Sequence, residues 1–266
     1  GWTGSRSRRP WSWMPRMNCP RNALGAWLAL ALGAALASSP AVAVAEREMR
    51  TLAPSPYKAR YQVHYRGLNG GQIENSLRRG AGTDQWLYET RAYPSLLGRI
   101  AVSPSARERG TMQISGPGVR PLTFSFDDGT PATDKDVRLD FDWSAGVVKG
   151  SAQHGPFELA VTPGTQDTAS VQAAMIVELL AGREPRSFRI FTGGKVKEYR
   201  YWSEGRATVV TPYGQFDAVV WANQRDGSPR VTKVWHAPSL GYLPVQAVQY
   251  RKGQPEVQMR LVALER

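Results

Sequence analysis

Residues 166–183 read QDTASVQAAMIVELLAGR, the clearest helical stretch in a sequence whose other segments have the patterns of strands. Asp167 or Thr168 can accept hydrogen bonds from the unpaired amides of a first turn, and Gly182 stands where a left-handed C-terminal cap is favoured. Between these ends, apolar residues cover almost the whole circumference, which is typical of a buried helix. The sequence therefore predicts a helix over Gln166–Arg183 that strands cover on more than one side.

Strand patterns fill the rest of the chain from residue 57 onward. Residues 57–68 alternate between apolar and polar side chains, and residues 136–143 do the same. Turns such as Asn69-Gly70-Gly71 separate these segments, and strands do not alternate with helices. We expect a mainly β fold: an antiparallel curved sheet or barrel-like domain of about a dozen strands wrapping one central helix, Gln166–Arg183.

The first 45 residues have the order of a secretory leader. Basic residues precede the apolar run Leu24–Leu36, and small residues that end at Ala45 offer a cleavage site. We expect an upstream extension and signal peptide over 1–45, a flexible lead-in over 46–56, and a single β-rich domain over 57–266. An uncleaved N-terminal anchor is the alternative.

The charge and the single cysteine indicate where the exported chain would work. Cys19 lies in the leader, so the cleaved chain would hold no disulfide, which fits a bacterial periplasm. Cleavage removes five Arg and no acidic residue, and the net charge falls from +12 to +7. This excess can attract anionic lipid headgroups or cell-wall polymers, although an ordinary solvated surface is the preferred explanation. We expect no nucleic-acid partner, and we expect that the cleaved chain is not an integral membrane protein.

Several short motifs between residue 57 and the C-terminus occur in an order that resembles one protein family. They are Tyr61-x-Val63-x-Tyr65-x-Gly67 followed by Gly71, Phe141-Asp142-Trp143, Gln166-Asp167 with Ser170, Thr211-Pro212-Tyr213-Gly214, and Trp235-x-Ala237-Pro238 followed by Tyr242-Leu243-Pro244-Val245. Together they resemble a domain-of-unknown-function (DUF) family of proteobacterial periplasmic proteins. The resemblance implies a periplasmic, mostly antiparallel β protein without an established activity. Its shape would be similar to the open barrels of lipoprotein-carrier and lipocalin-like folds, an analogy that does not determine function.

The acidic segment Asp127–Asp142 is the strongest candidate for chemistry. Its members are Asp127, Asp128, Asp134, Asp136, Asp140 and Asp142. These carboxylates could bind calcium or act on glycans in an envelope hydrolase, and Asp142 is the first to test. The spacing of a calcium loop is absent, however, and a polar outer strand face beside an acidic turn explains the same residues.

Other catalytic and metal-binding patterns are missing from the sequence. The three histidines, His64, His154 and His236, have no zinc-ligand spacing. The serine nucleophile elbow and the phosphate-binding loop are also absent. We therefore expect no catalytic residue, no metal site and no cofactor.

The helix and one strand supply the candidate ligand contacts. Met175 and Leu179 could face Phe141 and Trp143 across a lipid-sized pocket, or the same side chains could fill the core. We expect a non-enzymatic periplasmic envelope protein that binds a hydrophobic or amphipathic ligand, such as a lipid, or an envelope protein partner. The alternatives are the glycan hydrolase and a regulatory or scaffolding module, which would show a large exposed apolar patch.

Overall fold

The computed structural model describes residues 53–82, 84–100, 102–116, 118–133, 135–152, 155–192 and 194–266. The predicted leader, most of the lead-in, Asp134 and His154 lie outside these residues, so the domain boundaries stay predictions.

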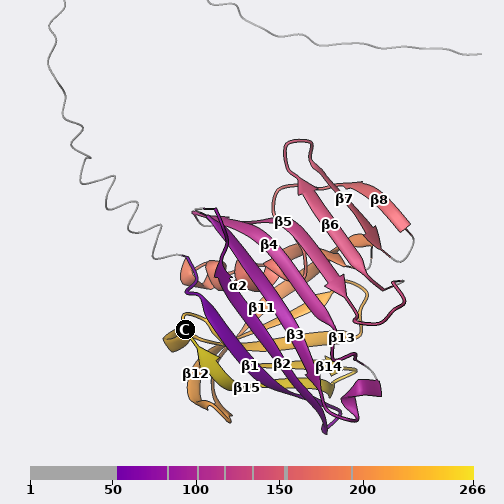
Figure 1. Ribbon diagram of the computed structural model, residues 1–266. Coiled ribbons are helices and arrows are strands. Elements are labelled where there is room, and N and C mark those ends of the chain that lie inside the picture. Colours follow the sequence, from indigo (N-terminus) through magenta and orange to yellow (C-terminus); the bar gives the residue numbers. More distant parts are fainter. Residues whose placement is uncertain are drawn as a thin grey trace, which may run out of the picture. The chain divides into compact units, whose positions relative to one another are not determined.

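Fifteen strands, one α-helix and two short 3-10 helices make up the described part of the chain (Figure 1). The strands before the helix are β1 (Tyr57–Tyr65), β2 (Leu68–Arg79), β3 (Gln85–Pro94), β4 (Arg107–Ser115), β5 (Gly118–Asp127), β6 (Val137–Asp142), β7 (Val147–Ala152), β8 (Gly155–Ala160) and β9 (Thr165–Gln166). The helices are η1 (Gly98–Ile100), α2 (Ser170–Leu180) and η2 (Pro238–Leu240). The later strands are β10 (Ser187–Thr192), β11 (Lys195–Thr211), β12 (Gly214–Arg225), β13 (Arg230–Ala237), β14 (Leu243–Arg251) and β15 (Gln254–Glu265). Among the described residues, no helix has the length and apolar character needed to cross a membrane.

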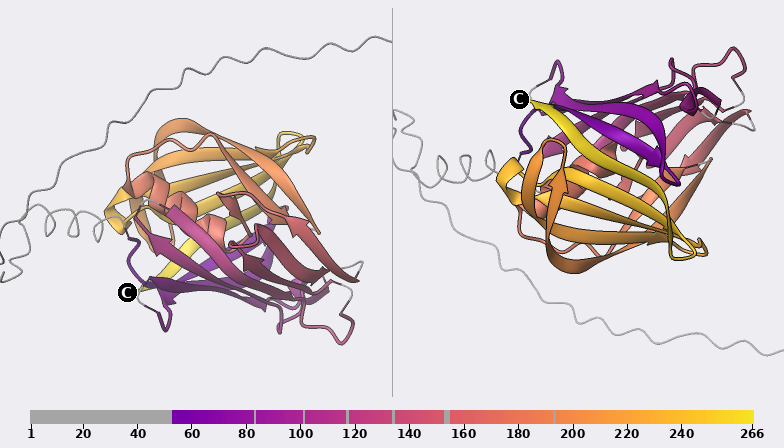
Figure 2. Two further views of the ribbon diagram at one scale, coloured as in Figure 1. Left: turned by 90° about the horizontal axis from the view of Figure 1, so that it is seen from above. Right: turned by 90° about the horizontal axis from the view of Figure 1, so that it is seen from below.

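All these strands form one sheet in the order β8-β7-β6-β5-β4-β3-β2-β1-β15-β14-β13-β12-β11-β10-β9. β1 pairs with β15, so the first and last strands lie side by side in the middle of the sheet. The pairs are antiparallel except for β9 with β10, which run parallel. The edge strands, β8 and β9, follow each other in the sequence, and the sheet curves without closing into a barrel (Figure 2). This confirms the expected fold class, with fifteen strands in place of a dozen.

β1 shows why the alternating sequence selects this sheet. Ala59 and Tyr61 are buried on its inner face. On its outer face, Lys58 and Arg60 lie 3.9 and 3.2 Å from the carboxylate of Glu74 on β2. A shift of the pairing by one residue would bury these charges and expose the apolar side chains, so burial of one face determines the register.

Helix α2 begins at Ser170 and ends at Leu180, so the predicted span Gln166–Arg183 is too long at both ends. Asp167 starts the helix: its Oδ1 accepts hydrogen bonds from the amides of Ala169 (2.9 Å) and Ser170 (2.7 Å). Gln166, before this cap, is free to pair as a strand residue in β9. At the other end, Gly182 adopts a φ of +66° and its amide donates to Leu179, which confirms the left-handed cap.

The start of α2 lies against strands of the N-terminal half of the sheet. A Cβ atom on Gly110 of β4 would lie 2.7 Å from the Cβ of Ala169, so only glycine permits this approach. Gln166 also donates its side-chain amide to the carbonyl of Val119 on β5, at 2.9 Å. These contacts hold the edge strand β9 and the helix against β4 and β5.

The helix is covered on nearly every side, because its apolar residues belong to more than one cluster. Ala173 and Val177 pack with Trp86 and Met112 of β3 and β4. On another face, Met175 and Leu179 pack with Trp221 of β12. Figure 2 shows α2 inside the curve of the sheet, toward one end of it. This confirms one helix wrapped by strands.

Candidate functional site

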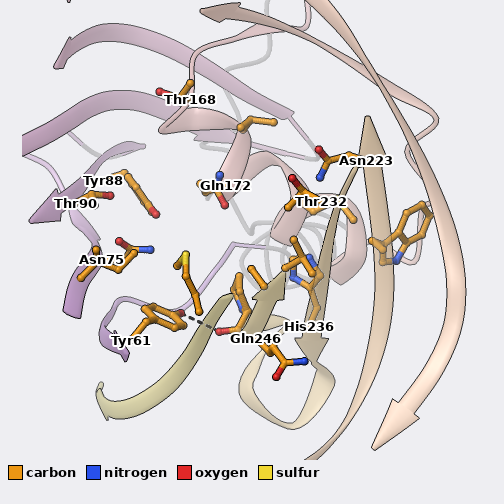
Figure 3. Close-up of a pocket in the computed structure, with 18 of the residues that line it drawn as sticks. Tyr61, Asn75, Tyr88, Thr90, Thr168, Gln172, Asn223, Thr232, His236 and Gln246 are labelled. Atoms are coloured by element: carbon orange, nitrogen blue, oxygen red, sulfur yellow. Dashed lines mark hydrogen bonds between the residues drawn. The ribbon is translucent and has the colours of Figure 1, made fainter. Parts of the chain in front are cut away.

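A cavity of about 400 Å³ lies inside the curved sheet, between β1–β4, β10–β15 and the first half of α2 (Figure 3). Its apolar lining consists of Ile73, Val171, Met175, Ile190, Trp221, Val234, Pro244, Ala247 and Met259. Its polar lining consists of Asn75, Thr90, Glu108, Thr168, Gln172, Asn223, Thr232, His236 and Gln246. Five tyrosines complete the wall: Tyr57, Tyr61, Tyr88, Tyr199 and Tyr201. The described wall is therefore amphipathic.

The described lining contains no Lys or Arg. Burial raises the pKa of Tyr57, Tyr61, Tyr88 and Tyr201 above the ordinary value, so these hydroxyl groups stay uncharged at neutral pH. Tyr61 donates its hydroxyl proton to the carbonyl of Pro244 at 2.9 Å, which ties β1 to β14 along one wall of the cavity (Figure 3). The described wall thus offers hydrogen-bonding groups but no cation.

His236 supplies an uncharged acceptor. Its Nδ1 lies 2.9 Å from the carbonyl oxygen of Tyr242 and must donate, because a carbonyl only accepts. Burial lowers the pKa of His236 to about 4, so the ring is neutral at pH 7 and its Nε2 carries a free lone pair. The ring lies beside Gln246 at one side of the cavity (Figure 3).

Two further acceptors lie on the opposite wall, on β2 and β4. The Oδ1 atom of Asn75 is buried without a hydrogen-bond partner, a state that costs free energy unless a ligand or water supplies a donor. Glu108 accepts a hydrogen bond from the hydroxyl of Thr168 at 2.8 Å, and burial raises the pKa of Glu108. These groups favour a ligand that brings hydrogen-bond donors.

A second carboxyl group lies at the start of the helix. Asp167 is completely buried, and its Oδ2 atom has no hydrogen-bond partner. The pKa of Asp167 is raised to about 7: burial is the main cause and the neighbouring charge of Glu108 contributes, against the lowering effect of the capping hydrogen bonds. This carboxyl group is therefore part of the helix cap and does not line the cavity.

The structure does not bring the four predicted ligand contacts together. Met175 lines the central cavity, whereas Leu179 does not. Phe141 is buried in the cluster that contains Trp86, where it stacks on Trp143 at a centroid separation of 5.6 Å. Trp143 lines a separate hollow of about 840 Å³ against another face of α2, formed with β4, β5 and β10. Ligand binding by these residues stays a prediction.

The acidic segment lies on exposed turns and on the outer face of β6. Asp127, Asp128 and Asp136 have carboxylate oxygens within 4.8 Å of one another, close enough to share a cation. However, Lys135 lies 3.5 Å from Asp128, and the turn's own amides bond to Asp127 and Asp128. Asp142 caps its own turn by accepting from Ser144 and Ala145. None of these residues lines the two cavities described above.

Asn75 and Glu108 of the cavity wall were not singled out by the sequence, and His236 was considered there only as a zinc ligand. For Asn75 and His236, the alternation of apolar and polar residues along their strands contains a signal. Asn75 interrupts the inward apolar series between Ile73 and Leu77, and His236 ends the series that Val234 belongs to. A polar residue at an inward position marks either a buried network or a cavity, and only the folded structure distinguishes the two.

Three solved structures with a similar backbone path share little sequence with this chain. A β-barrel-like protein of domain of unknown function DUF1849 from Brucella abortus is 15% identical, with a TM-score of 0.48, 80% of this chain covered and 98% of that one. An exported protein with YmcC-like fold from Bacteroides fragilis is 10% identical, with a TM-score of 0.35, and coverage of 80% and 97%. The MucA/MucB complex of Pseudomonas aeruginosa gives 13% identity, a TM-score of 0.31, and coverage of 85% and 57%. Likenesses this remote carry no information about ligands or partners.

The sequence matches no curated protein. It does match a family over most of the described sheet, which confirms the resemblance to a family of unknown function. Residues 60–262 match the protein of unknown function family DUF3108, and the chain belongs to that family.

Proposed function

We propose that this protein is exported to the bacterial envelope and binds an uncharged amphipathic molecule in its central cavity, without transforming it. The observation that carries this proposal is the cavity of about 400 Å³, which is lined by strands from both halves of the sheet and by α2. Its volume falls in the range of ordinary small-molecule sites, which is about 300–1,000 Å³.

The charge of the cavity wall argues for an uncharged head group. An anionic head group would find no Lys or Arg among the described lining residues, and His236 is neutral at pH 7. An unpaired charge in such a partly buried site is costly. Asn75 and His236 instead offer acceptors to hydroxyl or amide donors. The apolar wall, which includes Met175 and Trp221, would hold an alkyl or ring portion.

Export is supported by the leader-like order of residues 1–45 and by the absence of cysteine after Cys19. A hydrolase acting through Asp127–Asp142 has less support, because the described carboxylates of that segment are outside the cavity and bond to their own turns. An envelope protein partner is compatible with ligand binding in the cavity.

Native mass spectrometry of the protein purified from the periplasm tests the proposal. Wild-type protein should carry an adduct that is released on denaturation and is uncharged at neutral pH. The variant Val234→Phe places a larger side chain in the cavity and should lose this adduct. Val231→Phe is the matched control, because residue 231 lies on the same strand with its side chain on the opposite face.

Three outcomes would contradict the proposal. The first is wild-type protein with no adduct that also fails to bind added monoacylglycerol, an uncharged amphiphile with two hydroxyl groups. The second is an adduct that Val234→Phe retains as fully as Val231→Phe does. The third is an anionic adduct, which would overturn the inference about the head group.

A further inference from the structure

Four aliphatic side chains project into solvent from the connection between β3 and β4. The exposed fractions are 83% for Leu96, 62% for Leu97, 87% for Ile100 and 44% for Val102. These residues form and flank the 3-10 helix η1, and we call them the apolar loop. Single exposed aliphatic residues are ordinary on a protein surface. Four within seven positions form an exposed apolar patch, and contact between such a patch and water is unfavourable.

The backbone of the apolar loop is held in place by polar contacts. Ser95 donates its hydroxyl proton to the carbonyl of Asn69 at 2.7 Å, and its amide donates to Gly70 at 3.1 Å. The Ser95 hydroxyl also accepts from the amide of Gly98 at 3.1 Å. A Cβ atom on Gly98 would lie 2.2 Å from the Gly70 carbonyl oxygen, so glycine is required where the two segments cross. The projecting side chains therefore stand on an anchored turn.

The exposed apolar surface continues onto the neighbouring turn. Tyr65 and Leu68 pair across the β1–β2 turn and are 48% and 62% exposed. Tyr93 lies three positions before Leu96 and is 47% exposed. In Figure 1 the purple segment with η1 lies beside the β1–β2 turn at the lower end of the strands. The apolar loop and this turn form one edge of the molecule.

Arginines outnumber carboxylates at this edge. Two buried carboxylates, Glu89 and Glu256, are each shared by three arginines, which leaves both clusters with a net positive charge. One acidic turn, at Gly129, borders the edge through Ser103. Residues 90–107 and 62–73 contain no Asp or Glu. They carry Arg66, Arg91, Arg99 and Arg107, all of which are exposed. Arg66 lies over the ring of Tyr65, with its guanidinium carbon 5.2 Å from the centroid. Aliphatic tips flanked by arginine and tyrosine are the composition of a segment that enters the interface of an anionic membrane.

We propose that the apolar loop, Leu96, Leu97, Ile100 and Val102, docks the protein on an anionic lipid surface. The aliphatic side chains enter the boundary between headgroups and acyl chains, and the arginines contact the headgroup phosphates. The positive charge of this edge favours an anionic lipid surface as the occupant, because the phosphate group of each lipid headgroup can pair with an arginine. The inference does not depend on what the central cavity binds.

Co-sedimentation with vesicles tests this docking. Protein purified from the periplasm is mixed with vesicles of phosphatidylglycerol and phosphatidylethanolamine, and in parallel with vesicles of phosphatidylcholine alone. Wild-type protein should bind the anionic vesicles, and binding should weaken as salt rises. The double variant Leu96→Ser/Ile100→Ser should partition at least about tenfold less. Arg99→Gln should weaken binding about fivefold.

Val210→Ser is the matched control, because Val210 is also an exposed aliphatic residue, at 66%, but lies on β11 outside this edge. Its binding should equal that of wild type, and circular dichroism should show that all variants are folded. Equal binding by the double variant and by Val210→Ser would overturn the proposal. Failure of the wild-type protein to bind either kind of vesicle would overturn it as well. A wild-type dimer that the double variant converts to monomer, without vesicle binding, would assign the apolar loop to a second copy of the chain.

Discussion

Replacing Asp167 with asparagine is expected to remove a loss of stability that the protein suffers as the pH rises. The carboxyl group of Asp167 has two roles that this substitution separates. Its Oδ1 accepts the capping hydrogen bonds of Ala169 and Ser170, and an asparagine oxygen can accept the same bonds. Its ionisation, however, places a charge in a fully buried position beside Glu108, and asparagine cannot ionise.

The sign and size of the effect follow from the pKa of Asp167. Burial raises this pKa from 3.8 to about 7, so the folded state holds the proton more tightly than the unfolded chain does. The contribution that this proton makes to the free energy of unfolding is fully present below pH 3.8 and is lost as the pH rises to about 7. The whole loss is roughly 4 kcal/mol, and about 3 kcal/mol of it falls between pH 5 and pH 8.

Urea unfolding followed by tryptophan fluorescence at several pH values from 5 to 8 measures this effect. The free energy of unfolding of wild type should fall relative to that of Asp167→Asn by about 3 kcal/mol across this range. Comparing the two proteins at each pH cancels the titration of other groups. Asp167→Ala is the control for the cap: it should cost about 1 kcal/mol through the lost acceptor and should also lack the pH dependence.

Parallel pH profiles for wild type and Asp167→Asn would refute this reasoning, since they would show that Asp167 does not change its protonation on unfolding. A profile in which Asp167→Asn is the more pH-sensitive protein would refute it as well.

Two further substitutions test the packing of the helix and the state of the cavity. Gly110→Ala should lower the free energy of unfolding by about 1–3 kcal/mol, because its methyl group would overlap Ala169. Adding Ala169→Gly should recover part of this loss in urea unfolding, and an additive double variant would contradict the contact. His236→Gln should resist acid better than wild type, because burial lowers the pKa of His236 from 6.5 to about 4 and stability is lost as the pH falls across that window. Acid titration by circular dichroism measures this, and identical acid midpoints would contradict it.

The helix and the strands were accessible from the sequence because their signals are local. The alternation in β1 predicts which side chains face inward, and Ala59 and Tyr61 are indeed buried. The position of Asp167 and Gly182 predicts both helix caps, although the helix is shorter than its apolar pattern. Such signals depend on residues within a few positions of one another, so tertiary contacts are not needed to read them.

The candidate site was much less accessible. Met175 lines the central cavity, whereas Phe141 and Trp143 lie away from it, because β6 lies beyond β5 toward the β8 edge of the sheet. Asn75 and His236 come to line the same cavity only after β1 pairs with β15, a contact that no short-range pattern predicts.

The sequence by itself determined the class of fold, the inward and outward faces of the strands, and the approximate place and the caps of helix α2, since these arise from side-chain period and local hydrogen bonding. Only the tertiary structure decided which inward residues surround a cavity and which fill the core. It also decided that the carboxyl group of Asp167 is buried and that the apolar loop stays exposed. Burial and proximity are properties of segments far apart in the chain, and they come into existence only when the sheet has formed.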